Sequence, residues 1–116
     1  MVLGVASVLV YTGDVARAAE FYTRLLGVAG RPEGSTTMFV AGSLRLVLHP
    51  DKSPARAGVR GAMEFDVEVA DAAAFHAALR ERGIAADPPR RFPWGWTGFP
   101  VTDPDGNTVE VYQIER

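Results

Sequence analysis

Cysteine is absent from this sequence of 116 residues. Disulfide frameworks, thiolate zinc sites, iron–sulfur clusters and cysteine nucleophiles are therefore excluded. Histidine is scarce as well, because only His49 and His76 are present, and no nucleophile-elbow motif accompanies them. The lack of cysteine fits a reducing cytoplasm, where we expect the protein to be located, and is also compatible with export.

An excess of positive charge is lacking too, since 12 Lys and Arg stand against 14 Asp and Glu, a net charge of −2. A nucleic-acid partner needs clustered basic residues, and the arginines here are scattered, so none is expected. The N-terminal apolar run, Val2 to Tyr11, is shorter than the roughly 20 residues that cross a bilayer, and lacks the features of a signal peptide. We therefore expect a buried strand there and no membrane partner.

The composition that remains is that of a globular protein, with 47% hydrophobic and 22% charged residues. The length fits one domain over residues 1–116. Within it, a first module over residues 1–50 and a second module over residues 61–116 share one order of predicted elements. The linker between them, residues 51–60, mixes proline, glycine and charges without apolar periodicity.

Each module contains one predicted helix that follows an aspartate and ends at a glycine, the residue types that favour the two ends of a helix. The helices cover residues 15–26 and 72–82, with Asp14 and Asp71 as their N-caps. The predicted strands cover residues 5–11, 36–40, 44–48, 62–69, 90–92, 97–102 and 108–114. This order predicts an α+β fold of two tandem βαβββ modules.

An internal repeat brings equivalent positions of the two modules together, so they can contribute to one site. Superposing the two helix N-caps pairs Ser7 with Glu64. Superposing the glycines of the two later hairpin turns pairs Leu46 with Glu110. These four positions are therefore candidates for a shared site.

Three segments carry a family resemblance: GDVARAAEFYTRLLGV at 13–28, EFDVEVADAAAFHAALRERGI at 64–84 and FPWGWTGFPVTDPDGNTVEVYQ at 92–113. Together they resemble the vicinal oxygen chelate superfamily, which includes glyoxalases, extradiol dioxygenases and bleomycin-resistance proteins. The resemblance implies a curled mixed sheet around a concave pocket, usually completed in a homodimer. The bleomycin-resistance branch is the most similar.

The resemblance also implies a metal site at Ser7, Leu46, Glu64 and Glu110. A first-row transition metal prefers three or more imidazole or carboxylate donors, and only the two glutamates offer them. We therefore expect no metal cofactor, and catalysis is left open with a preference against it. The alternative is a lyase, isomerase, dioxygenase or thiol transferase that holds Mn, Fe, Ni or Zn through Glu64 and Glu110.

The remaining polar candidates have two interpretations each. His49 follows a strand end and is expected to face a loop, whereas His76 lies on the second helix, away from the pocket. The alternation of Glu64, Asp66 and Glu68 predicts either the wetted face of a half-buried strand or a ligand-facing acidic surface.

The segment from Phe92 to Pro100 contains both tryptophans, separated by small residues that leave their ring faces accessible. Trp94 and Trp96 either stack on a flat ligand or close a sheet edge or dimer seam. Tyr11 and Tyr112 share strand faces with two of the implied metal positions.

These features predict a protein that binds and sequesters a small organic molecule, such as an antibiotic, without converting it. Aromatic and apolar side chains would provide contact area, and carboxylates would attract a cationic or hydrogen-bond-donating ligand. The predicted ligand-binding residues are Trp94, Trp96, Tyr11, Leu9, Leu46, Leu48, Glu64, Asp66 and Tyr112. A regulatory domain that only dimerises is the third possibility.

Overall fold

The computed structural model describes residues 1–50 and 61–115, so the predicted linker lies outside the described residues. The first module contains β1 (Val8–Thr12), α1 (Val15–Leu26), β2 (Arg31–Glu33), β3 (Thr36–Ala41) and β4 (Leu44–Pro50). Its strands form a mixed sheet, the first sheet, in the order β1-β4-β3-β2. Only the β1–β4 pair is parallel.

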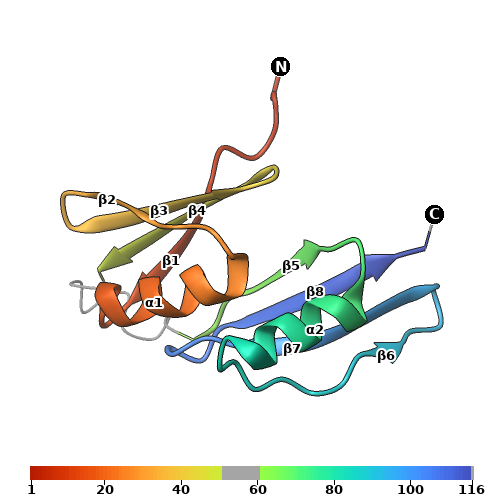
Figure 1. Ribbon diagram of the computed structural model, residues 1–116. Helices are drawn as coiled ribbons and strands as arrows, with labels where there is room; N and C mark the ends of the chain where they lie inside the picture. Colours follow the sequence, from red (N-terminus) through yellow and green to blue (C-terminus); the bar gives the residue numbers. More distant parts are fainter. Residues whose placement is uncertain (51–60, 116) are drawn as a thin grey trace.

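The second module repeats this arrangement with β5 (Glu64–Glu68), α2 (Ala72–Glu81), β6 (Arg90–Arg91), β7 (Trp96–Thr102) and β8 (Thr108–Ile114). Its strands form the second sheet in the order β5-β8-β7-β6, again with one parallel pair, β5–β8. Figure 1 shows α1 along one side of the first sheet and α2 along one side of the second. The predicted α+β fold of two βαβββ modules is confirmed.

Local sequence explains where the helices begin and end. The Asp14 carboxylate accepts a hydrogen bond from the backbone N–H of Arg17 at 3.0 Å, and Asp71 does the same for Ala74. Gly27 ends α1 in the left-handed conformation, with φ of 70°, which glycine adopts without strain. No helix in the described part of the chain is long and apolar enough to cross a membrane.

The strands differ most from the prediction at β1 and β2, whereas the other strand ends shift by no more than two residues. β1 begins at Val8, and residues 1–7 form no strand, although they are apolar. β2 was not predicted, because it has three exposed residues including Pro32, and a proline at a sheet edge gives no apolar alternation to detect. Neither difference changes the order of the modules.

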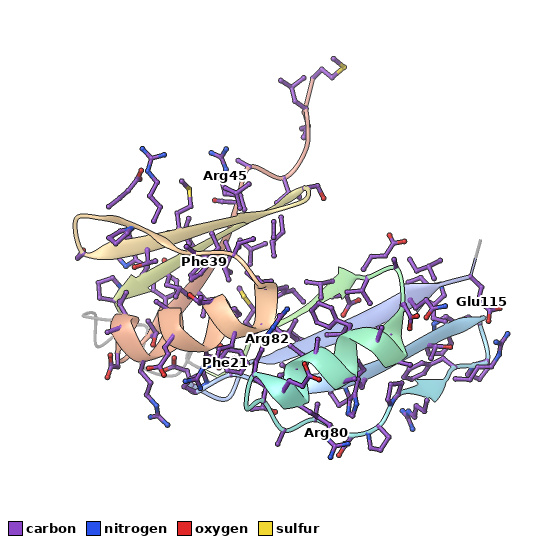
Figure 2. The ribbon with its side chains drawn as sticks, viewed as in Figure 1. Phe21, Phe39, Arg45, Arg80, Arg82 and Glu115 are labelled. Atoms are coloured by element: carbon purple, nitrogen blue, oxygen red, sulfur yellow. The ribbon has the colours of Figure 1, made fainter. Side chains whose placement is uncertain are left out.

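Strand alternation places one face of each sheet against its helix, and these faces form the hydrophobic core. Phe39 and Tyr22 pack between the first sheet and α1, with ring centroids 6.3 Å apart. Figure 2 shows Phe39 on the α1 side of this sheet and Arg45 on the opposite side. In the second module, Leu79 of α2 belongs to the same core as Phe99 of β7. The opposite face of each sheet, which we call its open face, carries no helix of the described residues.

The prediction that Leu46 and Leu48 line the binding pocket is wrong. Both side chains are completely buried on the α1 side of β4, in the core. Because side chains alternate along a strand, the neighbouring residues Val47 and His49 take the open face instead.

The physical reason for this error is the length of the two hairpin turns. Gly42 is the first residue of a two-residue turn, whereas Gly106 is the fourth of the five residues between β7 and β8. Aligning these glycines therefore shifts β4 by one residue, and a one-residue shift moves every side chain to the other face. The strand pairings make Val47, rather than Leu46, the counterpart of Glu110.

Candidate binding site on the second sheet

The open face of the second sheet carries several acidic and aromatic residues. Along one row of paired positions, Asp66 of β5 lies beside Glu110 of β8. Along the next row, Tyr112 of β8 lies opposite Gly98 of β7. Since paired residues point to the same side of a sheet, these side chains share one surface.

Four rings form what we call the aromatic cluster: Phe92, Trp94, Trp96 and Tyr112. Phe92 stacks on Trp94, with ring centroids 5.0 Å apart. Trp96 and Tyr112 make an edge-to-face contact, with ring centroids 4.9 Å apart. The Phe92 and Tyr112 rings are 5.5 Å apart, which joins the two pairs. Trp94 is 59% exposed, so one large ring remains open to a ligand.

Gly98 allows this cluster to form against β7. A Cβ atom at this position would lie 2.5 Å from Cδ1 of Tyr112 and 2.2 Å from the carbonyl oxygen of Val111. Both distances are shorter than a Cβ atom tolerates, so only glycine leaves room for the Tyr112 ring over the strand.

Glu110 is a carboxylate of this face with a raised pKa. Burial raises the pKa of Glu110, the nearby charges of Glu64 and Asp66 raise it further, and Arg90 opposes them. Its Oε2 atom is buried and, within the described ranges, has no hydrogen-bond partner. A buried acceptor without a donor is costly, and a ligand that supplies a donor or a positive charge relieves that cost.

The carboxylates also act on the aromatic cluster. Burial raises the pKa of the Tyr112 phenol, and the charges of Glu110, Asp66 and Glu64 add to the effect, whereas Arg90 opposes it. Tyr112 therefore remains a neutral hydroxyl at physiological pH. The aromatic cluster and the three carboxylates consequently form one continuous acidic–aromatic surface.

A cleft of about 770 Å³ between the two modules adjoins this surface. It is bordered by Ser7 and Arg45 of the first module and by Asp66 and Glu68 of the second. Asp66 therefore belongs to the cleft and to the open face of the second sheet. A ligand on the acidic–aromatic surface can extend into the cleft past this residue.

The open face of the first sheet carries Leu9, Tyr11, Val47 and His49. His49 was predicted to face a loop, but it lies in β4, opposite Tyr11, with the two rings 5.5 Å apart. His76, by contrast, lies on α2 as predicted, where its Nε2 is 3.0 Å from the carbonyl oxygen of Ala86. Neither histidine lies on the open face of the second sheet.

The residues present do not fit a transition-metal centre. Among the described residues, no group of three or more His, Asp or Glu is arranged to hold a metal ion. Glu64 and Glu110 share one face, but their first-module counterparts are Ser7, with a neutral hydroxyl, and Val47, with no donor.

The structure brings Glu64, Asp66, Trp96 and Tyr112 of the predicted site together on the second sheet. Trp94 lies in the turn between β6 and β7, with its ring centroid 6.4 Å from that of Trp96. Leu9 and Tyr11 lie on the open face of the other sheet. Their roles in binding stay predictions.

Two residues of this surface, Phe92 and Arg90, were not predicted. The guanidinium carbon of Arg90 lies 4.7 Å from the centre of the Phe92 ring. Arg90 pairs with Gly98, which places it in the same row as Tyr112. Alternation of side chains along β6 and β7 would have indicated that Arg90 faces the same side as Tyr112. β6 is only two residues long, however, which is too short for an alternating pattern to be recognised in the sequence.

A family model decides the evolutionary relationship. The model of the Glyoxalase/Bleomycin resistance protein/Dioxygenase superfamily matches residues 4–111, almost the whole chain. The chain belongs to this superfamily. This confirms the family that the three sequence segments suggested, and the superfamily's two-module fold accounts for the two sheets. A comparison with curated proteins gave no match.

Solved structures of the superfamily show the same architecture. A bleomycin resistance determinant encoded on the transposon Tn5 matches with a TM-score of 0.78 and 22% identity, over 97% of this chain and 99% of that one. A bleomycin-binding protein complexed with bleomycin matches with a TM-score of 0.76 and 22% identity, over the same fractions. A lactoylglutathione lyase from Agrobacterium tumefaciens matches with a TM-score of 0.78 and 23% identity, over 97% and 95%. At these identities the likeness shows the fold alone.

Proposed function

We propose that this protein binds a small, planar organic cation on the acidic–aromatic surface and sequesters it without chemical conversion. The observation that carries the proposal is the buried Oε2 of Glu110, which lacks a donor among the described residues beside a cluster of four aromatic rings. A cation with a flat apolar body satisfies both features at once. The ring faces provide stacking, and the carboxylates provide the counter-charge.

The charge of this surface defines the ligand class. The charges of Glu64 and Asp66 add to the rise in the pKa of Glu110, so this surface disfavours further negative charge. A bound cation reduces this repulsion, whereas an anion increases it. Binding is therefore selective for positive charge, and the aromatic cluster selects for a planar shape.

Two of the structural neighbours support this class of function, because one is a bleomycin resistance determinant and another was solved with bleomycin bound. Bleomycin is accordingly one ligand to test. The incomplete donor set, with Ser7 and Val47 as the first-module counterparts of the glutamates, supports a role without a metal. We place the protein in the cytoplasm, in keeping with the absence of cysteine.

Titration with 9-aminoacridine, a planar aromatic cation, tests this proposal. Because Trp94 and Trp96 lie in the site, we expect their fluorescence to be quenched with saturation at one probe per chain. Mass spectrometry of the recovered probe is expected to show an unchanged molecule.

The matched control ligand is 9-anthracenecarboxylate, which has a similar three-ring plane and the opposite charge. We expect it to bind at least about tenfold more weakly, because it meets the carboxylates instead of neutralising them. Equal binding of the two ligands, or conversion of either one, would contradict the proposal. Bleomycin is titrated in the same way to test whether an antibiotic of this kind is a ligand.

We further propose that the protein is a homodimer. β1 and β5 are each at the edge of a sheet, and such edges offer unpaired backbone groups to another chain. Leu9 and Val40, 37% and 52% exposed, give the open face of the first sheet an apolar character that a second copy would cover.

Sedimentation equilibrium is expected to give a mass twice the 12.5 kDa of one chain. The contact between the two copies is favoured because it buries the apolar open face of the first sheet. Leu9→Asp is expected to shift the mass toward that of a single chain, whereas Ala73→Asp on the exposed side of α2 is expected to leave the dimer intact. A monomer across the concentrations of the binding titration would contradict the dimer.

A further inference from the structure

Two consecutive arginines on β6 face opposite sides of the second sheet. Arg90 pairs with Gly98 and therefore lies on the open face, in the row of Tyr112. Arg91 pairs with Thr97 on the other side, where its Nη2 donates to Oε2 of Glu115 at 2.9 Å. One arginine is thus held by a carboxylate, while the other reaches into the acidic–aromatic surface.

Arg90 already occupies the kind of position that we assign to the ligand. Its guanidinium lies 4.7 Å from the centre of the Phe92 ring, within the range of a cation–π contact. Its charge also reaches the carboxylates, because it counteracts the rise in the pKa of Glu110 and of Tyr112. Arginine stays protonated throughout the physiological range, so this cation is present at every pH at which the protein works.

We infer that Arg90 is an internal counter-cation that competes with the ligand for the Phe92 ring and the carboxylates, and so sets the affinity of the site. The inference rests on the proposed binding of a cation. Arg90 is exposed on a two-residue edge strand, so its long side chain is free to swing aside when a ligand cation arrives. The site consequently excludes weakly bound cations, such as simple amines, that cannot displace Arg90.

The test compares Arg90→Gln with Arg91→Gln, which remove the same charge from opposite sides of one strand. With 9-aminoacridine as the probe, Arg90→Gln is expected to tighten binding about two- to fivefold, the factor that corresponds to one exposed cation–π contact. Arg91→Gln is expected to stay within the error of wild type. Arg90→Lys, which retains a cation, is expected to return affinity toward the wild-type value.

A second measurement needs no ligand. Titration of the Glu110 carboxyl carbon by NMR is expected to show a higher pKa in Arg90→Gln than in wild type, and no change in Arg91→Gln. Unchanged or weaker probe binding in Arg90→Gln, with wild-type binding intact, would overturn the inference and leave the proposed function standing. Absence of probe binding in wild type and in every variant would overturn both, and the Glu110 titration would then report only that Arg90 faces the carboxylates.

Discussion

Replacement of Asp103 by alanine is expected to lower the free energy of unfolding by about 3–4 kcal/mol. Asp103 is 4% exposed and lies in the turn between β7 and β8. Its carboxylate accepts a hydrogen bond from the Tyr22 hydroxyl of α1 at 2.7 Å, across 81 positions of the sequence. Removal of the carboxylate leaves this buried hydroxyl, and other donors, without an acceptor.

The network around Asp103 explains the size of the effect. Oδ1 accepts hydrogen bonds from the backbone N–H groups of Asp105 and Asn107, each at 2.9 Å. Oδ2 accepts a further hydrogen bond from Nδ2 of Asn107 at 2.9 Å. Burial raises the pKa of Tyr22 well above its usual range, and the hydrogen bond to Asp103 adds to this, so the phenol remains a donor. The network joins α1 of the first module to the β7–β8 turn of the second.

Urea unfolding of Asp103→Ala, Tyr22→Phe and Asp87→Ala measures this prediction. Tyr22→Phe removes one donor and leaves the remaining network, so its cost is expected to be about 1–2 kcal/mol. Asp87→Ala removes an equal charge from an exposed position and is expected to change stability by less than about 0.5 kcal/mol. A decrease in the free energy of unfolding of less than about 1 kcal/mol for Asp103→Ala would show that this turn does not stabilise the contact between the two modules.

The sequence contained the local signals of this fold but little of its long-range pairing. Asp14, Asp71 and Gly27 act on backbone groups within a few residues, and their predicted positions at the helix ends match the structure. Asp103 falls between the predicted strands 97–102 and 108–114, and in the structure it begins the turn that joins β7 to β8. Its hydrogen bond to Tyr22 could not be predicted, because a turn sequence does not specify which helix packs against it.

In the candidate site too, the alternation along single strands was visible in the sequence, whereas the pairing between strands was not. Alternation along single strands grouped Glu64 with Asp66 and Tyr112 with Glu110, and the pairing of β5 with β8 puts these two groups on one face. Leu46 was assigned wrongly, because the register of β4 depends on the length of a turn rather than on its glycine. Arg90 was missed, because its place beside Phe92 follows from pairing with Gly98.

Glu110→Gln is expected to weaken the binding of 9-aminoacridine by about tenfold or more. The variant replaces a partly buried carboxylate by a neutral amide of similar shape, and a charge-assisted contact contributes about 1.5–3 kcal/mol. Fluorescence titration at pH 7 measures this loss. In wild-type protein, the raised pKa of Glu110 means that the carboxylate protonates at a higher pH than an ordinary glutamate. Cation affinity is therefore expected to fall as the pH is lowered from 7 toward 5, and this fall is expected to be smaller in Glu110→Gln.

The same variant is expected to raise stability at neutral pH. Because the pKa of Glu110 is raised in the folded protein, the folded chain binds this proton more tightly than the unfolded chain, so the charged form opposes folding at pH 7. The gain in the free energy of unfolding is expected to vanish below the ordinary glutamate pKa of about 4.3, where Glu110 is protonated in both states. Opposite changes in affinity and stability from one substitution would indicate a carboxylate that serves binding rather than the fold.

Glu81→Gln is the matched control, because it removes the same charge from an exposed position on α2, on the other side of the second sheet. It is expected to leave affinity and its pH dependence unchanged, so a loss shared by both variants would point to net charge and contradict a local role for Glu110.

Calorimetric titration of chelator-treated protein with Mn²⁺, Ni²⁺ and Zn²⁺ separates binding of an organic cation from a metal centre. One tightly bound ion per chain, lost in Glu110→Gln, would assign the carboxylates to a metal and favour a metal-dependent enzyme. Weak binding that is equal in wild type, Glu110→Gln and Glu81→Gln is the result expected from two glutamates without a third donor.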